Sequence, residues 1–540
     1  MKKIKQIALL CLIGASAMSL SSCLIRLDAN DTRVKKDLTY TWSDEDYNKL
    51  HINMQRFSQA LKNNNDLELV GSWQAVQRTA YACATYRTIE NINYAAGDDS
   101  AYEKYLKFQN IVAEVAKWQE ALYSDMYESS YRDSFFSGYT KEEIEELINS
   151  VKPDKYYEIE EEQEALIKEY NDLAKDEIQL KTSDIYLSLV KNYKEEATLL
   201  GYDNYMDYAY KNIYEREYTP SEVLDFTTYV KNHIVPMMLE IAPKVKEAAS
   251  GLNESEKQKY NTFKTANFNT MKDTFNLYAT FIGDSFKTNA NYVFNNGYIR
   301  YGSENANIDG AFTAYLYMSS LDQPIIYFGP SYTDIMTFVH EFGHYNNFKV
   351  NKATNLSYDL AETHSQGNEL LFLAWLDKND ESYSDNLMRA IHLSEVYEAL
   401  TTIVLATMVN DFEYRVYTSS NDLTIADFDT YYKEAGDALG GYDTIMECLY
   451  QENNGKQIDY WKLVTIQNPA YYISYAMSKI PSLEIYSIAK EDLAKARNSY
   501  KKTYTLDKNL DLTDFLGVLD SAGLYSPFKE EAFTLIEKLK

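Results

Sequence analysis

Two histidines and a glutamate in the stretch TFVHEFGHYNNF (residues 337–348) have the types and spacing of a hydrolytic metal site. His340 and His344 are four positions apart, so on a helix their imidazoles lie on one face and can bind one Zn²⁺ ion. Glu341 is displaced by one residue, which places its carboxylate beside that ion, where it can accept a proton from an activated water molecule. Gly343 costs about 1 kcal/mol relative to alanine in mid-helix, which the close approach of another element would explain.

A third metal ligand is needed, and the helical stretch SYDLAETHSQGNELLFLAWL (residues 357–376) offers one. Glu362 follows His344 at a distance that leaves room for a helix end, a turn and a returning helix. Glu369 lies two turns further along the same face, where it can orient a ligating histidine. His364 lies roughly on the opposite face, and we interpret it as structural or exposed. The alternative is a hydrogen-bonded histidine pair in the core and a solvated glutamate.

These residues resemble the zinc peptidases of the thimet oligopeptidase and oligoendopeptidase F family. That family carries H-E-[FL]-G-H and then E-x-x-S-x-x-x-E, which the chain matches from His340 to His344 and from Glu362 to Glu369. The resemblance implies that His340, His344 and Glu362 hold Zn²⁺ and that Glu341 is the general base. It covers roughly residues 200–490.

Two upstream segments also resemble that family. DGAFTAYLY is similar to its Gly-Ala-aromatic segment, and QPIIYFG is similar to the edge strand along which the substrate lies. A peptide would bind such a strand by β-augmentation, which tolerates many sequences. The residues that the resemblance assigns to substrate binding are Gly310, Ala311, Ile325, Ile326 and Tyr327.

A tyrosine-rich segment, NPAYYISYAMSKIPSLEIY (residues 468–486), resembles a helix of the same family. Tyr471 and Tyr475 share one helical face, and a phenol hydroxyl can stabilise a developing oxyanion. Because the chain holds 50 tyrosines, ordinary core or surface tyrosines are the alternative. The chain also departs from the family's pattern. Asn347 replaces a histidine common in the family. No histidine follows His392, although the family has one before its tyrosine cluster, and this absence bears on the rate, the specificity or both.

The elements that must position these residues are mostly helical, since glycine (19) and proline (9) are scarce. We expect helices over residues 41–200, a small sheet within 286–330 with 324–329 as its clearest strand, and helices to the end. The resemblance implies a two-lobed helical zincin (a gluzincin) with a deep substrate channel. We predict an N-terminal helical region at 41–200 and a catalytic domain at 201–540.

Helix starts are marked by local capping patterns. Ser43 with Asp46 three positions later is typical of a capping box. Thr219-Pro220-Ser221-Glu222 combines a capping residue, proline at the first helical position and an early acid. Ser331 or Thr333 is expected to cap the helix that carries the H-E-x-x-H motif.

The N-terminus predicts export and lipidation. Three lysines precede the apolar run IALLCLIGASAMSL, which ends in Leu20-Ser21-Ser22-Cys23, a sequence similar to a lipobox. We predict a lipoprotein signal peptide at residues 1–22, lipidation of Cys23 and a tether at 23–40. The mature protein would then be extracytoplasmic and lipid-anchored to a bacterial membrane. An ordinary secretory signal is the alternative.

The charge composition limits the classes of partner that the protein can bind. With 81 Asp+Glu against 53 Lys+Arg, the chain is not expected to bind nucleic acid, which needs a basic face. The sequence leaves open whether Cys83 and Cys448 pair in an oxidising compartment.

These observations together predict a monomeric zinc endopeptidase that cleaves short unstructured oligopeptides. The alternatives are a non-catalytic peptide-binding lipoprotein that retains the zinc site, another gluzincin (an aminopeptidase or a thermolysin-like enzyme), and a purely structural helical surface protein. The sequence disfavours another gluzincin, because alanine rather than asparagine precedes Glu362 and no Gly-x-Met-Glu-Asn loop occurs.

Overall fold

The computed structural model describes residues 35–149, 151–173, 177–352, 356–450, 459–505 and 510–540. The predicted signal peptide, Cys23 and most of the predicted tether lie outside the described residues. The chain divides into two compact units. The first comprises Met1–Lys152, Thr288–Thr333 and Asn351–Asn355, and the second Pro153–Lys287, Asp334–Val350 and Leu356–Lys540.

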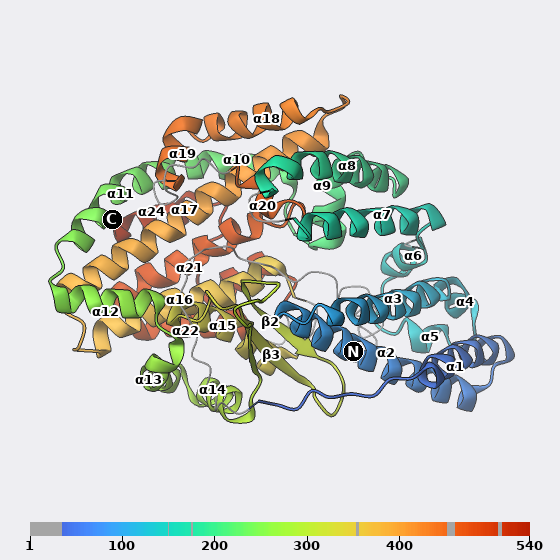
Figure 1. The fold of residues 1–540 in the computed structure, drawn as a ribbon. Coiled ribbons are helices and arrows are strands. Elements are labelled where there is room, and N and C mark those ends of the chain that lie inside the picture. Colours follow the sequence, from blue (N-terminus) through green and yellow to red (C-terminus); the bar gives the residue numbers. More distant parts are fainter. Residues whose placement is uncertain (1–34, 150, 174–176, 353–355, 451–458, 506–509) are drawn as a thin grey trace. The chain divides into compact units, whose positions relative to one another are not determined.

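The first unit begins with six helices, of which α2 packs against both α1 and α3 (Figure 1). An aromatic core of Phe57, Trp73 and Trp118 lies among them. The capping box of Ser43 and Asp46 starts α1 as predicted. The helices are α1 (Asp44–Asn63), α2 (Asp66–Ala95), α3 (Ser100–Glu120), α4 (Tyr123–Glu128), α5 (Arg132–Phe135) and α6 (Lys141–Asn149).

The first described residues are packed onto this unit. The Tyr40 ring stacks on Tyr86 with 4.1 Å between ring centroids, and the Trp42 ring meets Phe108 edge-on at 5.6 Å. The amide of Lys36 donates a hydrogen bond to the carbonyl of Gly297. The end of the predicted tether, from residue 36 onward, is therefore held against the helices and the sheet region of its own unit.

A three-stranded sheet completes the first unit, in the order β1-β3-β2. Strand β1 (Ile299–Tyr301) is parallel to β3 (Gln323–Phe328), and β2 (Ala311–Leu316) is antiparallel to it. The predicted small sheet is confirmed, but its predicted edge strand is wrong. The strand that contains Ile325, Ile326 and Tyr327 is central, so among the described residues the edges are β1 and β2.

Burial explains why β3 is central. The side chains from Ile325 to Phe328 are all fully buried, and the hydroxyl of Tyr327 donates to the carbonyls of Ala95 and Ile308 at 2.8 Å each. Ile326 and Tyr327 have strand partners on both sides, so their backbone cannot pair with a peptide. A continuous apolar run of this length is typical of a strand buried on both faces.

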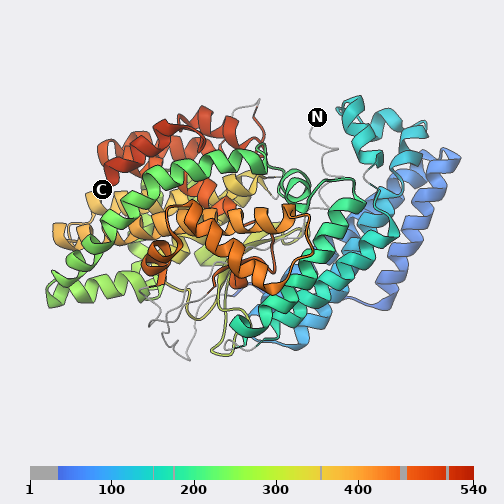
Figure 2. The same ribbon diagram turned by 90° about the horizontal axis from the view of Figure 1, so that it is seen from above.

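Helix α14 (Asp284–Asn296) links the two units, and all the remaining helical elements belong to the second. Helix α16 packs against α21 and α22, and α17 packs against α11 and α21. The C-terminal helices, red in Figure 2, gather near the end marked C. The elements are α7 (Asp154–Asn171), α8 (Ile178–Leu199), α9 (Tyr205–Tyr208), the π-helical η2 (Ala209–Ile213), α10 (Pro220–Tyr229), the π-helical η3 (Val230–Ile234), α11 (Val235–Ser250), α12 (Glu254–Thr265), the 3₁₀ turn η4 (Phe268–Met271), α13 (Lys272–Ile282), α15 (Ile335–Asn351), α16 (Tyr358–Asn379), α17 (Asp385–Thr418), α18 (Ile425–Ala438), α19 (Tyr442–Tyr450), α20 (Trp461–Val464), α21 (Ile473–Glu491), α22 (Leu493–Tyr504), α23 (Phe515–Ala522), α24 (Glu530–Ile536) and the 3₁₀ turn η5 (Glu537–Leu539).

The helix starts agree with the sequence at Thr219 and differ at α15. Thr219 forms a capping box with Glu222, and Pro220 stands at the first position of α10. At α15 the capping carboxylate belongs to Asp334, which accepts hydrogen bonds from the amides of Met336 and Thr337. Ser331 instead donates to Asp309, so the prediction of Ser331 or Thr333 as the cap is wrong.

Two further findings concern the membrane and the cysteines. Within the described part of the chain, no helix has the length and apolarity needed to cross a membrane. Cys83 and Cys448 are both free thiols, and burial raises the pKa of Cys83 to about 12. The question that the sequence left open is therefore answered against a disulfide between them.

Candidate active site

Helices α15 and α16 make an unusually close approach at Gly343. A Cβ atom at this position would lie 2.4 Å from the carbonyl oxygen of His364 and 2.7 Å from the Cα of Ser365. Real Cβ atoms essentially never come within 3.0 Å of such atoms, so any residue other than glycine would force the two helices apart. The close approach expected at Gly343 is confirmed, and it brings the two motif helices into contact where their polar side chains meet.

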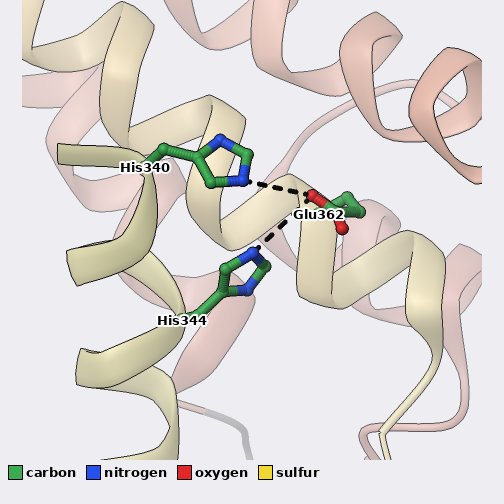
Figure 3. A group of neighbouring side chains, drawn as sticks. All are labelled: His340, His344 and Glu362. Carbon is green, nitrogen blue, oxygen red and sulfur yellow. Dashed lines mark ion pairs between the residues drawn. The ribbon is translucent and has the colours of Figure 1, made fainter. Parts of the chain in front are cut away.

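The two histidines of α15 face a single carboxylate on α16, as Figure 3 shows. The Nε2 atoms of His340 and His344 lie 3.6 Å and 3.7 Å from Oε2 of Glu362. One ligand atom from each of the three residues lies within 4.8 Å of the other two. The structure therefore brings the three predicted ligands together.

This group fits a tetrahedral zinc ion. Ligand atoms about 2.1 Å from such an ion lie about 3.4 Å from one another, close to the observed nitrogen-to-oxygen distances. Two imidazoles and one carboxylate also match the donor set of catalytic zinc sites, which keep a fourth position open. The His340 and His344 side chains are 19 % and 17 % exposed and that of Glu362 is 4 % exposed, so the site is accessible mainly from the histidine side.

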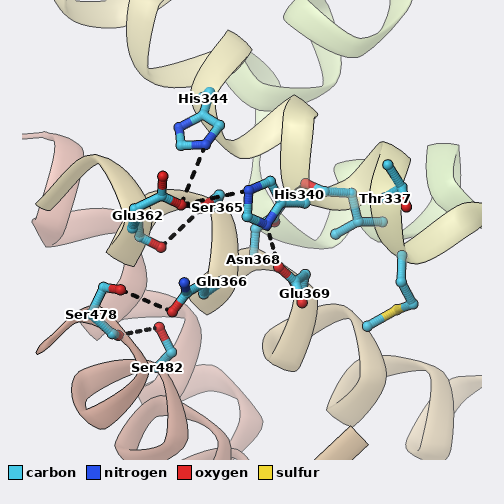
Figure 4. Close-up of polar contacts among 12 residues, drawn as sticks. Thr337, His340, His344, Glu362, Ser365, Gln366, Asn368, Glu369, Ser478 and Ser482 are labelled. Atoms are coloured by element: carbon cyan, nitrogen blue, oxygen red, sulfur yellow. Dashed lines mark hydrogen bonds and ion pairs between the residues drawn. The ribbon is translucent and has the colours of Figure 1, made fainter. Parts of the chain in front are cut away.

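Glu369 contacts the ring nitrogen of His340 that faces away from Glu362. Its Oε1 lies 2.5 Å from Nδ1 of His340 (Figure 4). Its Oε2 lies 3.6 Å from Nζ of Lys479. This contact leaves Nε2 of His340 facing Glu362, as a ligating histidine requires. Burial disfavours the ionised form of Glu369, but Lys479 and His340 outweigh burial and lower its pKa. The carboxylate that the sequence predicts to orient a histidine therefore contacts His340.

The electrostatics of the site favour one positive charge among the carboxylates. Burial opposes protonation of His340, but the hydrogen bond and charge of Glu369 outweigh it and raise the pKa to about 9. Burial and the neighbouring His340 lower the pKa of His344 well below its ordinary value. Burial also raises the pKa of Glu362, against the opposing effects of His340, Tyr471 and Ser365. A metal cation would take the place of the single proton in this arrangement.

Glu341 is buried on α15 between its two histidine neighbours in the motif, with 3 % of its surface exposed. Its charge is one of the influences that raise the pKa of His340, and it also raises the pKa of Tyr475. The carboxylate therefore lies near both the histidine group and the tyrosine cluster, as a proton acceptor at this site would need to.

The two predicted tyrosines have different surroundings. The hydroxyl of Tyr471 donates a 2.8 Å hydrogen bond to Oε1 of Glu362, so it is engaged with a candidate ligand. The ring of Tyr475 packs edge-on against Tyr471, and burial and then the charge of Glu362 raise its pKa well above the ordinary value. Tyr475 is therefore a neutral hydroxyl beside Glu341 and Glu362. Of the two, it is better suited to stabilise an oxyanion, whereas Tyr471 fits a role in orienting Glu362.

Other residues that the sequence analysis discussed lie outside the group of candidate ligands. The buried His364 lies with Nε2 2.9 Å from the carbonyl of Thr503, and burial lowers its pKa to about 3, consistent with the structural interpretation. Asn347 is buried at the position where the family has a histidine. Gly310 and Ala311 belong to the first unit, where Gly310 accepts a hydrogen bond from the amide of Gly329 and Ala311 begins β2.

Two contacts at the site were missed from sequence. Ser365 donates to Oε2 of Glu362 at 3.1 Å, and Asn368 donates to the carbonyl of Val339, which ties α16 to α15. The serine of the E-x-x-S pattern was the available signal for the first contact. Figure 4 also shows Gln366, which accepts a hydrogen bond from Ser478 and so connects α16 to α21.

Comparisons with known proteins support the fold. No protein-family model matches the chain, and no curated protein matches it. A solved structure from Bacillus anthracis described as an oligoendopeptidase F is 16 % identical, with a TM-score of 0.67 over 94 % of this chain and 97 % of its own. PZ peptidase A with an inhibitor is 15 % identical, with a TM-score of 0.69 over 94 % and 98 % of the two chains. A Pyrococcus furiosus carboxypeptidase is 13 % identical, with a TM-score of 0.52 over 91 % and 99 %. The predicted helical fold, that of oligoendopeptidase F structures, is thereby confirmed.

Proposed function

We propose that this chain, which has the fold of oligoendopeptidase F structures, is a zinc-dependent endopeptidase that hydrolyses short oligopeptides. The observation that carries the proposal is the convergence of His340, His344 and Glu362, whose ligand atoms lie within 4.8 Å of one another. The buried Glu341 beside the first ligand adds the base that hydrolysis requires. A structural role alone would not call for a buried base next to a metal-binding triad.

His340, His344 and Glu362 would hold the ion, with Glu369 orienting His340 and Tyr471 orienting Glu362. When bound, zinc polarises a carbonyl group and lowers the pKa of a water molecule. The chain supplies the proton transfers and the electrostatic stabilisation.

Glu341 would accept the proton from the attacking water molecule and return it to the leaving amine. Tyr475, kept neutral by its raised pKa, would donate a hydrogen bond to the carbonyl oxygen as negative charge develops there. No histidine follows His392, so a tyrosine is the available donor in this region of the sequence.

The substrate is expected to be short and unstructured. The three candidate ligands are less than one-fifth exposed, so a peptide bond reaches them only in an extended, locally unfolded segment. A folded domain would first have to unfold, at a cost of about 5–15 kcal/mol.

A carboxypeptidase is the second candidate, because the Pyrococcus furiosus carboxypeptidase shares the fold. The two activities differ in their need for a free C-terminus. A fluorescence-quenched peptide with both ends blocked is expected to be cleaved internally. Cleavage only of peptides with a free C-terminal carboxylate would instead establish the carboxypeptidase.

The direct test combines metal analysis with turnover. The purified protein should contain one zinc ion per chain, and Glu362→Ala should lose it. Glu341→Gln should retain zinc but lose activity by a factor on the order of 10²–10⁴, because an amide cannot accept the proton. The exposed Glu381 provides a matched control, and Glu381→Gln should behave as the wild type. Stoichiometric zinc without turnover in the wild type would favour a non-catalytic peptide-binding protein.

We further propose that the enzyme acts outside the cytoplasm, attached to a membrane through lipidated Cys23. The support is the sequence of the first 23 residues alone. Two acyl chains on one N-terminus are sufficient for stable attachment.

A further inference from the structure

The turn that carries Tyr471 is fixed by an arginine from a distant part of the chain. Arg216 donates through Nη1 to the carbonyl of Ala470 at 2.9 Å, and through Nη2 to the carbonyl of Tyr471 at 3.3 Å and to Oγ of Ser474 at 2.9 Å. These three acceptors span the turn and the first residues of α21. One planar guanidinium therefore fixes the backbone from which the Tyr471 side chain extends.

The same arginine also faces the helix that carries Glu362. Its Nε lies 4.0 Å from Oδ1 of Asp359, one helical turn before Glu362 on α16. The other oxygen of Asp359 accepts a 2.7 Å hydrogen bond from Tyr218. Arg216 thus contacts the backbone that carries Tyr471 and, through the Asp359 side chain, the helix that carries Glu362. The side chains of Tyr471 and Glu362 meet in a hydrogen bond.

The surroundings of Arg216 restrict its side chain to one conformation. Its side chain is 1 % exposed, and its guanidinium lies over the rings of Tyr210 and Tyr214 at 4.2 Å and 4.5 Å. Both rings come from or directly follow the π-helical segment η2. Tyr214 also donates to the carbonyl of Pro469 at 2.7 Å, which adds a fourth contact to the same turn.

Backbone strain is concentrated at this contact. Glu215 and Ala470, the residues directly before Arg216 and Tyr471, have φ values of +47° and +63°. Residues other than glycine adopt this left-handed region at a cost of roughly 1 kcal/mol each. The amide of Ala470 is held in place by Glu413, whose Oε1 accepts it at 2.8 Å. Strain that the surroundings maintain is a common property of functional sites.

We propose that Arg216 is a positioning residue for the metal site, because it fixes the turn of Tyr471 against the helix of Glu362 and so sets the orientation of that ligand. The inference rests on the proposed function, in which Glu362 binds zinc. It assigns a task to an arginine that contacts no candidate ligand directly. The consequence is that loss of the guanidinium should weaken metal binding through Tyr471.

The test measures zinc affinity by competition with a chelator, together with the visible absorption of the Co²⁺-substituted protein. Arg216→Lys keeps the positive charge near Asp359, but its single ammonium nitrogen cannot take both of the positions from which Nη1 and Nη2 reach the three acceptors. We expect zinc affinity to fall about tenfold, as for loss of an outer partner of a ligand, and the Co²⁺ spectrum to shift. Tyr471→Phe should produce a similar loss, and the double variant should be within threefold of the weaker single variant.

A matched control separates positioning from general stability. Arg415 also makes paired contacts, to Asp411 at 3.0 Å and Glu434 at 2.8 Å, but it lies on α17 and contacts neither the turn nor α16. Arg415→Lys should leave zinc affinity and the Co²⁺ spectrum unchanged. If Arg216→Lys does not fold, Ser474→Ala, which removes one acceptor, should still lower zinc affinity measurably.

Wild-type zinc affinity in Arg216→Lys or in Ser474→Ala would overturn the proposal. So would losses in Arg216→Lys and Tyr471→Phe that multiply in the double variant, because the two residues would then act independently. The zinc measurements do not depend on peptide cleavage. A wild-type protein that binds zinc but cleaves nothing would therefore refute the proposed function and leave the test of Arg216 intact.

Discussion

Replacing Gly343 with alanine should damage the metal site more than it damages the fold. The added methyl would lie 2.4 Å from the carbonyl oxygen of His364 and 2.7 Å from the Cα of Ser365. Both are backbone atoms, which cannot swing aside as a side chain can. To lengthen the contact with the His364 carbonyl from 2.4 Å to 3.0 Å, α15 and α16 must separate locally by about 0.6 Å.

This displacement acts directly on the ligands, because α15 carries both histidines and α16 carries Glu362. Metal–ligand distances tolerate changes of only about 0.2 Å, so a shift of about 0.6 Å should reduce zinc affinity by at least tenfold. The effect on folding is smaller. Overpacking lowers the free energy of unfolding by about 1–3 kcal/mol, and the higher helix propensity of alanine offsets about 1 kcal/mol of this loss.

The assay pairs urea unfolding of the metal-free protein with zinc competition. Gly71 in α2 offers a matched control, since no atom lies within 4 Å of a Cβ built there and the position is exposed. Gly71→Ala should stabilise the protein by up to about 1 kcal/mol and leave zinc affinity unchanged. If Gly343→Ala matched Gly71→Ala in both measurements, the close approach of the two helices would not be needed for metal binding.

Three further predictions follow from the surroundings of single residues. Tyr475→Phe should lower kcat by about 10²-fold with unchanged zinc affinity, whereas Tyr471→Phe should mainly weaken zinc binding. Steady-state kinetics and competition with a chelator measure the two effects. If Tyr471→Phe lowered kcat and Tyr475→Phe weakened zinc binding, the roles assigned to the two tyrosines would be exchanged. Burial raises the pKa of Glu413 from 4.5 to about 8, so its contribution to stability is present below pH 4.5 and lost as pH rises through about 8. Unfolding measured between pH 5 and 8 should therefore show a slope of up to about 1.4 kcal/mol per pH unit that Glu413→Gln flattens, and equal slopes would contradict this. Finally, Cys23→Ser should release the protein from membranes in a high-salt wash, and its retention in the membrane fraction would argue against the lipid anchor.

Features determined within a few residues were predictable from the sequence. The capping boxes at Ser43 and Thr219 were predictable because their hydrogen bonds close within one turn. The convergence of His340, His344 and Glu362 was predictable because the two histidines share a helix face and the glutamate follows in the next helix. The close approach at Gly343 was also predictable, because glycine destabilises the middle of a helix and is expected there only where another element comes near.

Features that depend on distant pairing were not predictable. The strand at Ile325–Phe328 was correctly identified, but its central place depends on two partners that the run itself does not specify. The bond between Tyr471 and Glu362 joins residues 109 positions apart, so the tyrosine gave no sign of its partner. Arg216 was one arginine in a tyrosine-rich stretch, and its role depends on a turn more than 250 positions away.

The interleaving of the two units has a consequence for how the chain folds. The chain leaves the second unit after Lys287, returns for the motif helix at Asp334, leaves it again after Val350 and returns at Leu356. During synthesis the first unit lacks its sheet until residue 328 has been made, and the second lacks most of its core until near the C-terminus. In the first unit α2 must therefore pack against β2, and in the second α16 must pack against α21, over long sequence separations, which makes folding slow and partly folded chains prone to aggregate. A truncation near residue 200 would also remove α7 and α8 from the second unit, so the catalytic half is not expected to fold when it is produced from that point.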